Sequence, residues 1–164
     1  MHRLLRLAAI PAAIVVAMLP AAASADSMTL TLPGSAALSA RINVMITLTI
    51  HCPAPPAGSV TLADGASVTV EQAAGTGVAS GSLFILDPAP NLPFPCDGST
   101  VQRTFSILAS PSGAPFHGGP AIVSAFAFAQ YGIDLCPPFG CFSSTGSANA
   151  SVVGTVLLKV TATS

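Results

Sequence analysis

The sequence predicts an exported all-β protein, in which a single antiparallel β-sandwich of about seven short strands follows a cleaved signal peptide. Two long segments place an apolar residue at every second position, which is the period of a strand with one buried face. No segment sustains an apolar period of 3.6 residues. The 15 prolines and 14 glycines among the 164 residues would interrupt most helices.

The first 25 residues have the three parts of a secretory signal. Arg3 and Arg6 give a positive start, residues 7–19 are apolar, and Ala23-Ser24-Ala25 fits a cleavage site. The apolar stretch is too short to span a bilayer comfortably, so an uncleaved anchor is the weaker alternative. We expect residues 1–25 to be removed. The remaining 139 residues, 26–164, would then form one domain that is secreted to the extracellular space.

The mature chain would carry few charges, with three cations, Arg41, Arg103 and Lys159, against six acidic residues. Its net charge is therefore about −3. Three scattered cations cannot form the basic stripe that nucleic acid requires, nor a polybasic patch for anionic lipid. The mature chain also has no second apolar run of membrane-spanning length. We predict no nucleic-acid partner and no membrane span.

The first strand signal lies at residues 28–32 and can continue to residue 40. Residues 42–52 give a stronger signal, and their predicted core face consists of Ile42, Val44, Ile46, Leu48, Ile50 and Cys52. Segments 67–72 and 78–86 follow as two strands joined by a turn at Gly75-Thr76-Gly77. Further turns are predicted at Asp64-Gly65 and Asp97-Gly98.

The second half of the chain supplies the remaining strands. Segment 101–109 alternates weakly, and segment 121–131 is rich in Ala and Phe, with Phe126 and Phe128 on one face. Segment 152–162 alternates strongly, with Val152, Val156 and Leu158 on one face. If consecutive strands run antiparallel, strand 42–52 ends at the pole where strand 101–109 begins, and these two strands are predicted neighbours. The loop that precedes strand 152–162 lies at the same pole.

Four cysteines in an exported chain favour two disulfides. Three pairings are possible, and the strand order favours Cys52–Cys96 with Cys136–Cys141. The competing interpretation is a metal or redox site. It is disfavoured because no C-x-x-C spacing occurs and only His51 and His117 remain in the mature chain. We predict no metal site and no cofactor.

These features resemble the immunoglobulin-like domains of secreted bacterial proteins. The resemblance rests on the strand that ends at Cys52, the S-V-T-V-E-Q-A strand, the A-S-P-S-G-A-P-F segment and the final alternating strand. It implies an immunoglobulin-like sandwich, although the tryptophan of antibody cores is absent. A narrower resemblance is to the neocarzinostatin-like apoproteins, which are carriers of a small chromophore. The chain shares their size, acidic character and a C-x4-C loop, here Cys136 to Cys141.

The sequence contains no H-E-x-x-H, G-x-S-x-G or Walker motif. The glycines at 75 and 77 lack the third glycine and the helix of a dinucleotide site, so a hairpin turn is favoured there. His117 lies in a turn and His51 on the outward face of its strand, where neither has an obvious catalytic partner. We predict no catalytic residues and no enzymatic activity.

The predicted pole gathers proline and phenylalanine from three loops. Prolines 53, 55 and 56 follow one strand, residues 91–95 precede Cys96, and residues 135–142 join the last two strands. Phe94, Phe139 and Phe142 are the candidate ligand-binding residues, because rigid loops that carry aromatics often form recognition surfaces. The alternative is that these rings turn inward and close the end of the core.

The sequence therefore predicts a non-enzymatic binding or structural module. Its partner would be a protein, a cell-surface component or a small molecule, and the composition does not choose among them. A small-molecule carrier of the neocarzinostatin-like type, with a pocket between the sheets near the same pole, is the alternative function.

Overall fold

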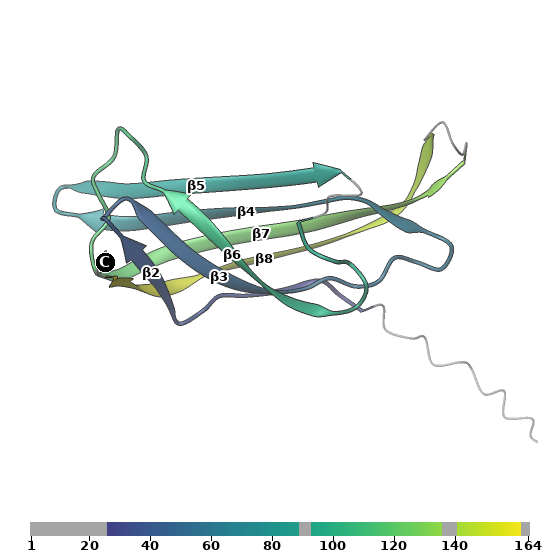
Figure 1. The fold of residues 1–164 in the computed structure, drawn as a ribbon, viewed down its shortest axis with the longest axis horizontal. Coiled ribbons are helices and arrows are strands. Elements are labelled where there is room, and N and C mark those ends of the chain that lie inside the picture. Colours follow the sequence, from purple (N-terminus) through teal and green to yellow (C-terminus); the bar gives the residue numbers. More distant parts are fainter. Residues whose placement is uncertain (1–25, 89–92, 136–140, 162–164) are drawn as a thin grey trace, which may run out of the picture.

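The computed structural model describes residues 26–88, 93–135 and 141–161, so the predicted signal peptide at residues 1–25 lies outside it. The described chain is all-β and contains no helix (Figure 1). Its strands are β1 (Thr29–Thr31), β2 (Ser35–Ser39), β3 (Asn43–His51), β4 (Val60–Ala74), β5 (Gly77–Pro88), β6 (Thr100–Leu108), β7 (Gly119–Asp134) and β8 (Phe142–Val160). Every predicted strand segment coincides with a strand, and the all-β prediction is confirmed.

The eight strands form one mixed sheet in the order β1-β3-β2-β8-β7-β4-β5, and β6 pairs with β3 outside this path. The predicted neighbours, strands 42–52 and 101–109, correspond to β3 and β6, which pair over nine residues from Asn43 to His51. The prediction of a purely antiparallel sheet is wrong, because β2 runs parallel to β8. The first segment divides around Pro33 and Gly34, and its second half joins the last strand of the chain.

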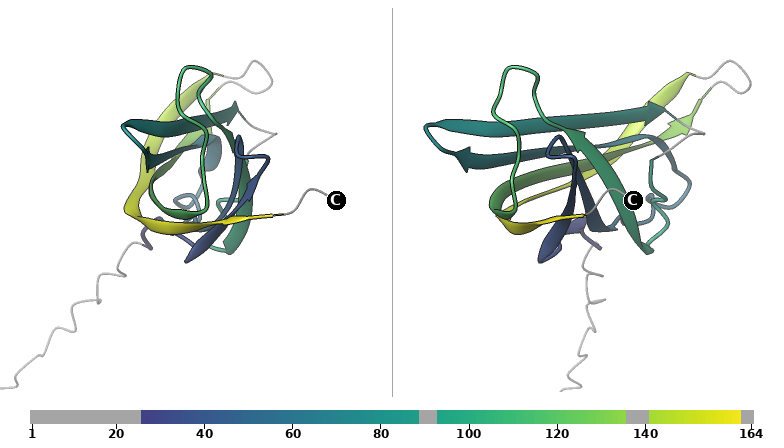
Figure 2. Two further views of the ribbon diagram at one scale, coloured as in Figure 1. Left: turned by 90° about the vertical axis from the view of Figure 1, so that its left-hand side faces the viewer. Right: turned by 60° about the vertical axis from the view of Figure 1, so that its left-hand side comes forward.

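The sheet folds into two layers (Figures 1 and 2). One layer contains β5, β4, β7 and β8 side by side, and β3 and β6 cross it at an angle. The layers also meet where β5 approaches the end of β6, because the Ser110 amide donates to the Ser80 carbonyl at 2.7 Å. A Cβ at Gly81 would collide with the Leu108 carbonyl oxygen, so this approach requires glycine.

The predicted alternation of the first strong strand is confirmed within β3. Val44, Ile46, Leu48 and Ile50 are fully buried, and Cys52 follows them into the core. The prediction that Ile42 belongs to the same core face is wrong, because its side chain is 53% exposed. It lies before β3 in a tight turn whose two preceding residues, Ala40 and Arg41, have positive φ. That turn directs Ile42 away from the core.

Strand β7 has the opposite distribution of side-chain size. Its inward positions are mostly small, because Ala125, Ala127 and Ala129 are all buried. Its outward positions include large apolar side chains, Ile122 at 56% exposed and Phe126 at 40%. These small inner residues and the branched side chains of β3 belong to the same core cluster.

Two of the predicted turns are present in the structure, and a third lies within a strand. Gly75 and Thr76 form a two-residue hairpin loop between β4 and β5, and Gly75 adopts a φ of +61°, which favours glycine. Asp97-Gly98 is a turn as predicted. The turn predicted at Asp64-Gly65 is wrong, because both residues lie within the long strand β4. The dipeptide favours a turn locally, but the pairing of β4 with both β5 and β7 prevails.

Candidate functional site

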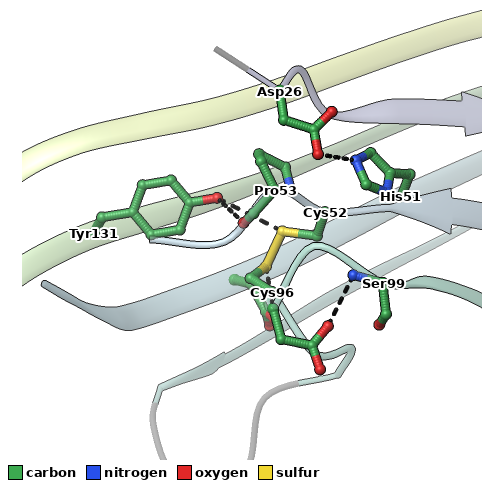
Figure 3. The surroundings of a disulfide bond; sticks show 9 residues. Asp26, His51, Cys52, Pro53, Cys96, Ser99 and Tyr131 are labelled. Atoms are coloured by element: carbon green, nitrogen blue, oxygen red, sulfur yellow. Dashed lines mark hydrogen bonds and ion pairs between the residues drawn. A yellow bond between two sulfur atoms is a disulfide. The ribbon is translucent and has the colours of Figure 1, made fainter. Parts of the chain in front are cut away.

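The predicted pole is held together by a disulfide at the end of β3 (Figure 3). Cys52 and Cys96 form this bond, with their Cα atoms 4.7 Å apart, which confirms the preferred pairing. The Gly98 amide donates to the Cys52 carbonyl at 3.0 Å. This bond holds the turn that leads into β6 against the end of β3. Cys141 is also disulfide-bonded, and Cys136, its predicted partner, lies outside the described residues.

At this pole, Tyr131 of β7 links its own layer to the loop that follows β3 in the other layer. Its side chain is buried, and its hydroxyl donates to the Pro53 carbonyl at 2.9 Å (Figure 3). Burial, and secondarily the negative charge of the buried Asp64, raises the pKa of the Tyr131 phenol. The phenol therefore remains protonated near neutral pH and keeps donating to the loop that follows β3.

Two polar contacts fix the outer side of the pole. His51 Nε2 lies 2.9 Å from the Asp26 carboxylate, so the N-terminal segment is held against β3. Asp97 accepts from the Ser99 amide at 2.9 Å. Hydrogen bonds from the Ser99 hydroxyl and then from its amide lower the pKa of Asp97. The other ring nitrogen of His51, Nδ1, lies 3.4 Å from the Thr100 hydroxyl at the start of β6.

The pole also has a pocket of about 460 Å³. Its lining residues come from the loop after β3, the Asp97-Gly98 turn and the facing strands: Asp26, Pro53, Ala54, Pro56, Gly98, Tyr131, Gly146, Ser147 and Ala148. The lining is mostly small and apolar, and it includes the Tyr131 side chain. This is the place where the sequence predicted loops rich in proline to gather.

The structure does not bring the predicted phenylalanines together on a surface. Phe94 is fully buried in the core, so it follows the inward alternative rather than the exposed one. Phe139 lies outside the described residues, and so does the side chain of Phe142, whose backbone begins β8. Leu135, which is 61% exposed, is the large apolar side chain of this loop that the structure describes.

Exposed aromatic residues occur instead on the outer face of the four-stranded layer. Strand register places Phe84 of β5, Ser67 of β4, Phe126 of β7 and Ser151 of β8 on one rung across this face. The next rung consists of Leu86, Gly65, Phe128 and Asn149. Phe84 is 60% exposed and Leu86 is 51% exposed. We call the outward residues of these two rungs the aromatic face.

The aromatic face is shaped by small residues in its middle strand. Ser67 and Gly65 lie between the larger side chains of β5 and β7. The Phe128 ring extends over Gly65, where a Cβ would come within 2.7 Å of the ring. Phe126 and Phe128 stack with their centroids 6.0 Å apart. The small residues of β4 thus separate the large side chains of β5 from those of β7 on this face.

A cleft of about 580 Å³ lies beside this face, at the junction of β5 and β6. The next two rungs of the layer lead into it through Thr69 with Ser82 and through Glu71 with Ser80. Ser110 of the following loop lies on its other side. The cleft therefore combines hydroxyl groups and the Glu71 carboxylate with the apolar residues Leu108 and Pro111.

His117 is part of a structural clamp at the far end of β4. Its Nδ1 lies 2.9 Å from the Gly118 carbonyl oxygen, and its Nε2 lies 2.9 Å from the Ala73 carbonyl oxygen. These two carbonyls, Gly118 first, raise the pKa of His117. The buried Gln72 completes the clamp, because its amide accepts from the His117 N–H and donates to the His117 carbonyl.

Among the residues that the structure describes, no three metal-ligating side chains gather into a group. The same residues include no helix that could cross a membrane. The chain matches no known protein family and no curated protein in sequence. The aromatic face was missed by sequence reasoning, although the A-F-A-F-A run at residues 125–129 was its signal.

Proposed function

We propose that this protein is an exported, non-enzymatic binding module that recognises its partner through the aromatic face. The observation that carries the proposal is the distribution of side chains in β7, where alanines are buried and Phe126 is 40% exposed. Large apolar side chains usually lie inside and small ones tolerate exposure. An exposed, contiguous group of aromatics is typical of a recognition surface.

The fold within this proposal is an immunoglobulin-like sandwich. Two sets of pairings support it: β3 with β6 in one layer, and the order β8-β7-β4-β5 in the other. Immunoglobulin domains of the variable type pair their strands in this pattern. The Tyr131 hydroxyl, which donates to a backbone carbonyl across the layers, adds a further link between them.

The proposed compartment is extracellular. The Cys52–Cys96 bond supports it, because structural disulfides persist in oxidising compartments. The leader-like residues 1–25 point the same way. Asp26, the first residue after the expected cleavage site, contacts His51 and can hold the new N-terminus against the domain.

Binding of the purified mature chain to the producing cells and their insoluble extracellular material tests the proposed function. We expect the wild-type protein to sediment with this material and the Phe84→Ser/Phe126→Ser variant to remain in the supernatant. Ile42→Ser is the matched control, because Ile42 is 53% exposed but lies in the turn before β3. Equal sedimentation of the wild-type and double-variant proteins would contradict the proposal.

A second candidate function is supported by the pocket at the pole. Its volume of about 460 Å³ and its lining by Pro53, Pro56 and Tyr131 suit a small apolar molecule. The protein would then be a small-molecule carrier. Native mass spectrometry of protein secreted by its own host tests this function. A mass above that of the disulfide-bonded polypeptide supports the carrier, and the polypeptide mass alone opposes it.

A further inference from the structure

We propose that the partner of the aromatic face is a second copy of this chain, which packs against the outer side of β5, β4, β7 and β8. This inference rests on the proposed function, because it requires the face to be a binding surface. It adds the identity of the partner and the symmetry of the complex. The size of the face, the places of its apolar side chains and the position of its single charge all support a symmetric pair.

The aromatic face is one end of a larger outer face that has the size of a protein interface. Strand register adds three rungs, of which the first consists of Ser82, Thr69, Ser124 and Val153. The second consists of Ser80, Glu71, Ile122 and Thr155. The third pairs Val78 with Ala73 on one side and Pro120 with Leu157 on the other. Five rungs on four strands give twenty outward positions.

Twenty positions are enough for a stable contact between two proteins. Ten residues span about 34 Å along the strands, and four strands span about 19 Å, which gives a projected area of about 650 Å². Side chains make the accessible area larger than this projection. A standard interface takes about 800 Å² of accessible surface and about 20–30 residues from each partner. The outer face therefore offers a second copy a contact of ordinary size.

The exposed apolar side chains of the outer face are placed evenly about its middle rung. Seven of its large apolar residues are between 40% and 71% exposed. Three of them lie on the two rungs at the aromatic end: Phe84, Leu86 and Phe126. Three lie on the two rungs at the opposite end: Val78, Ile122 and Leu157. The seventh, Val153, lies on the middle rung itself. Such a surface can cover itself when one copy is turned end over end.

A two-fold axis across the strands at the middle rung produces this arrangement. Phe126 then faces Ile122 of the second copy. Leu86 comes near the second copy's Val78, and Val153 meets its own counterpart. Two sheets packed in this aligned way lie about 10 Å apart, with their strands inclined by about 30°. Because the interface is isologous, each contact away from the axis occurs twice.

A hollow at the end opposite the aromatic rings gives the second copy room to enter. Its volume is about 370 Å³, and the small residues Ala73 and Pro120 lie in it between Val78 and Ile122. The two-fold axis at the middle rung brings the aromatic end of the second copy over this hollow. The projecting side chains of one copy therefore meet the recessed end of the other, at both ends of the interface.

The charge of the outer face selects this axis. Glu71 is the single charged residue among the twenty positions. The axis places its carboxylate opposite Ser67 of the second copy, whose hydroxyl can donate to it. The two Glu71 residues then stay roughly 14 Å apart along the strands. A two-fold axis along the strands would instead place Glu71 opposite Ile122 and bury the charge against an apolar side chain.

Association also changes what is measured at the face. In the dimer Phe126 is covered, so its exposure and the stability cost of replacing it depend on protein concentration. A variant that stays monomeric, or a wild-type sample well below the dissociation constant, reports the properties of the free face.

Sedimentation velocity of the mature, disulfide-bonded protein over roughly 1 to 200 µM tests the inference. We expect a monomer–dimer equilibrium with a dissociation constant of roughly 10 µM. Phe126→Ala should raise this constant at least about ten-fold, because the lost contact occurs twice. Ile42→Ala, which changes an exposed residue outside the face, should associate like the wild-type protein. A wild-type protein that is monomeric at the highest concentration would overturn the inference, and so would a dimer that Phe126→Ala leaves unchanged.

Charge reversal at the contact of Ser67 with Glu71 tests the axis. Ser67→Glu should abolish the dimer, because it brings two carboxylates together at each of two places. Adding Glu71→Lys should restore association to within about ten-fold of the wild-type value, because each carboxylate then faces an ammonium group. Melting temperatures show that both variants are folded. A Ser67→Glu dimer as tight as the wild-type dimer would overturn the inference, and failure of Glu71→Lys to restore the dimer would overturn the axis.

The sedimentation with cellular material distinguishes this inference from the proposed function. Because the producing cells would export the same chain, copies retained in their extracellular material are a source of this partner. If the protein is monomeric, yet that sedimentation still depends on Phe84 and Phe126, the second copy fails as the partner and the binding face stands. If the protein is monomeric and that sedimentation is independent of both rings, the proposed function fails as well.

Discussion

Strands β3 and β7 lie in the two layers of the sandwich and distribute large and small side chains in opposite ways. In β3 the large residues Ile46, Leu48 and Ile50 point inward and are fully buried. In β7 the alanines point inward, while Ile122 and Phe126 point outward. Both strands alternate with a period of two, so the period alone does not say which face is buried. The difference between them locates the candidate binding surface.

The two strands depend on each other. Their inward residues belong to one core cluster, to which β3 contributes branched side chains and β7 mostly alanines. Core packing accounts for the alanines of β7, but it gives no reason for phenylalanine on the outside of the same strand. An outward aromatic loses the hydrophobic stabilisation that burial would provide. The proposed binding role supplies the reason.

The largest expected effect is a stability difference between the two strands. Ile46→Ala should lower the free energy of unfolding by about 3 kcal/mol, because the residue is fully buried. Phe126→Ala should cost below about 1 kcal/mol, since it loses mainly the contact with Phe128. Chemical denaturation measures both values. A cost for Phe126→Ala that equals the Ile46→Ala cost would mean that the outer face is buried.

A second variant tests the inward face of β7. Ala127→Leu places a large side chain at a fully buried position opposite the β3 layer. Overpacking should lower the free energy of unfolding by about 2 kcal/mol. The control is Ser124→Leu, at a partly exposed outward position of the same strand, which should be nearly neutral. A stabilising Ala127→Leu would show unfilled space between the layers.

Tyr131 connects the end of β7 to the loop after β3. Tyr131→Phe removes the hydroxyl that donates to the Pro53 carbonyl, with little change in packing. We expect a loss of about 1 kcal/mol in the free energy of unfolding. Thermal denaturation under non-reducing conditions measures it, because the Cys52–Cys96 bond must stay intact. No change in stability would mean that water replaces the phenol at the carbonyl.

The smallest effect is a pH dependence at the start of β7. The Gly118 and Ala73 carbonyls raise the pKa of His117 above its ordinary value of 6.5. The stabilising contribution of His117 is therefore full below the unfolded-state pKa and is lost as pH rises through the folded-state pKa. Melting temperatures of the wild-type protein and His117→Gln, compared between about pH 5.5 and pH 8.5, test this sign.

The difference between those two proteins should be larger at the lower pH. The two proteins differ only at residue 117, so the contributions of all other groups cancel in the comparison. A difference that is independent of pH, or that grows toward pH 8.5, would contradict the contacts of the His117 ring with the two carbonyls.

The sequence predicted the strands because alternation and turn residues are local signals. It also predicted the pairing of β3 with β6 and the Cys52–Cys96 bond, since strand direction brings those segments together. It could not predict the parallel pairing of β2 with β8, which depends on a non-local crossover. Asp64-Gly65 was assigned to a turn because only tertiary pairing keeps it in a strand.

The candidate site was harder to predict than the fold. Phe126 and Phe128 were recognised as sharing a face, but composition favours burying phenylalanine rather than alanine. Only the position of β3 reveals that the alanine side faces the core. Phe84 and Phe126 are 42 positions apart in the sequence, and the register through β4 is what places them on one rung.

Solvent exposure of the individual phenylalanine rings tests the central claim most directly. Selective labelling of phenylalanine and a soluble paramagnetic chelate would report each ring by nuclear magnetic resonance. We expect strong broadening for Phe84 and Phe126, which are 60% and 40% exposed, and little for the buried Phe94 and Phe116. Protection of Phe126 equal to that of Phe116 would contradict an outward aromatic face.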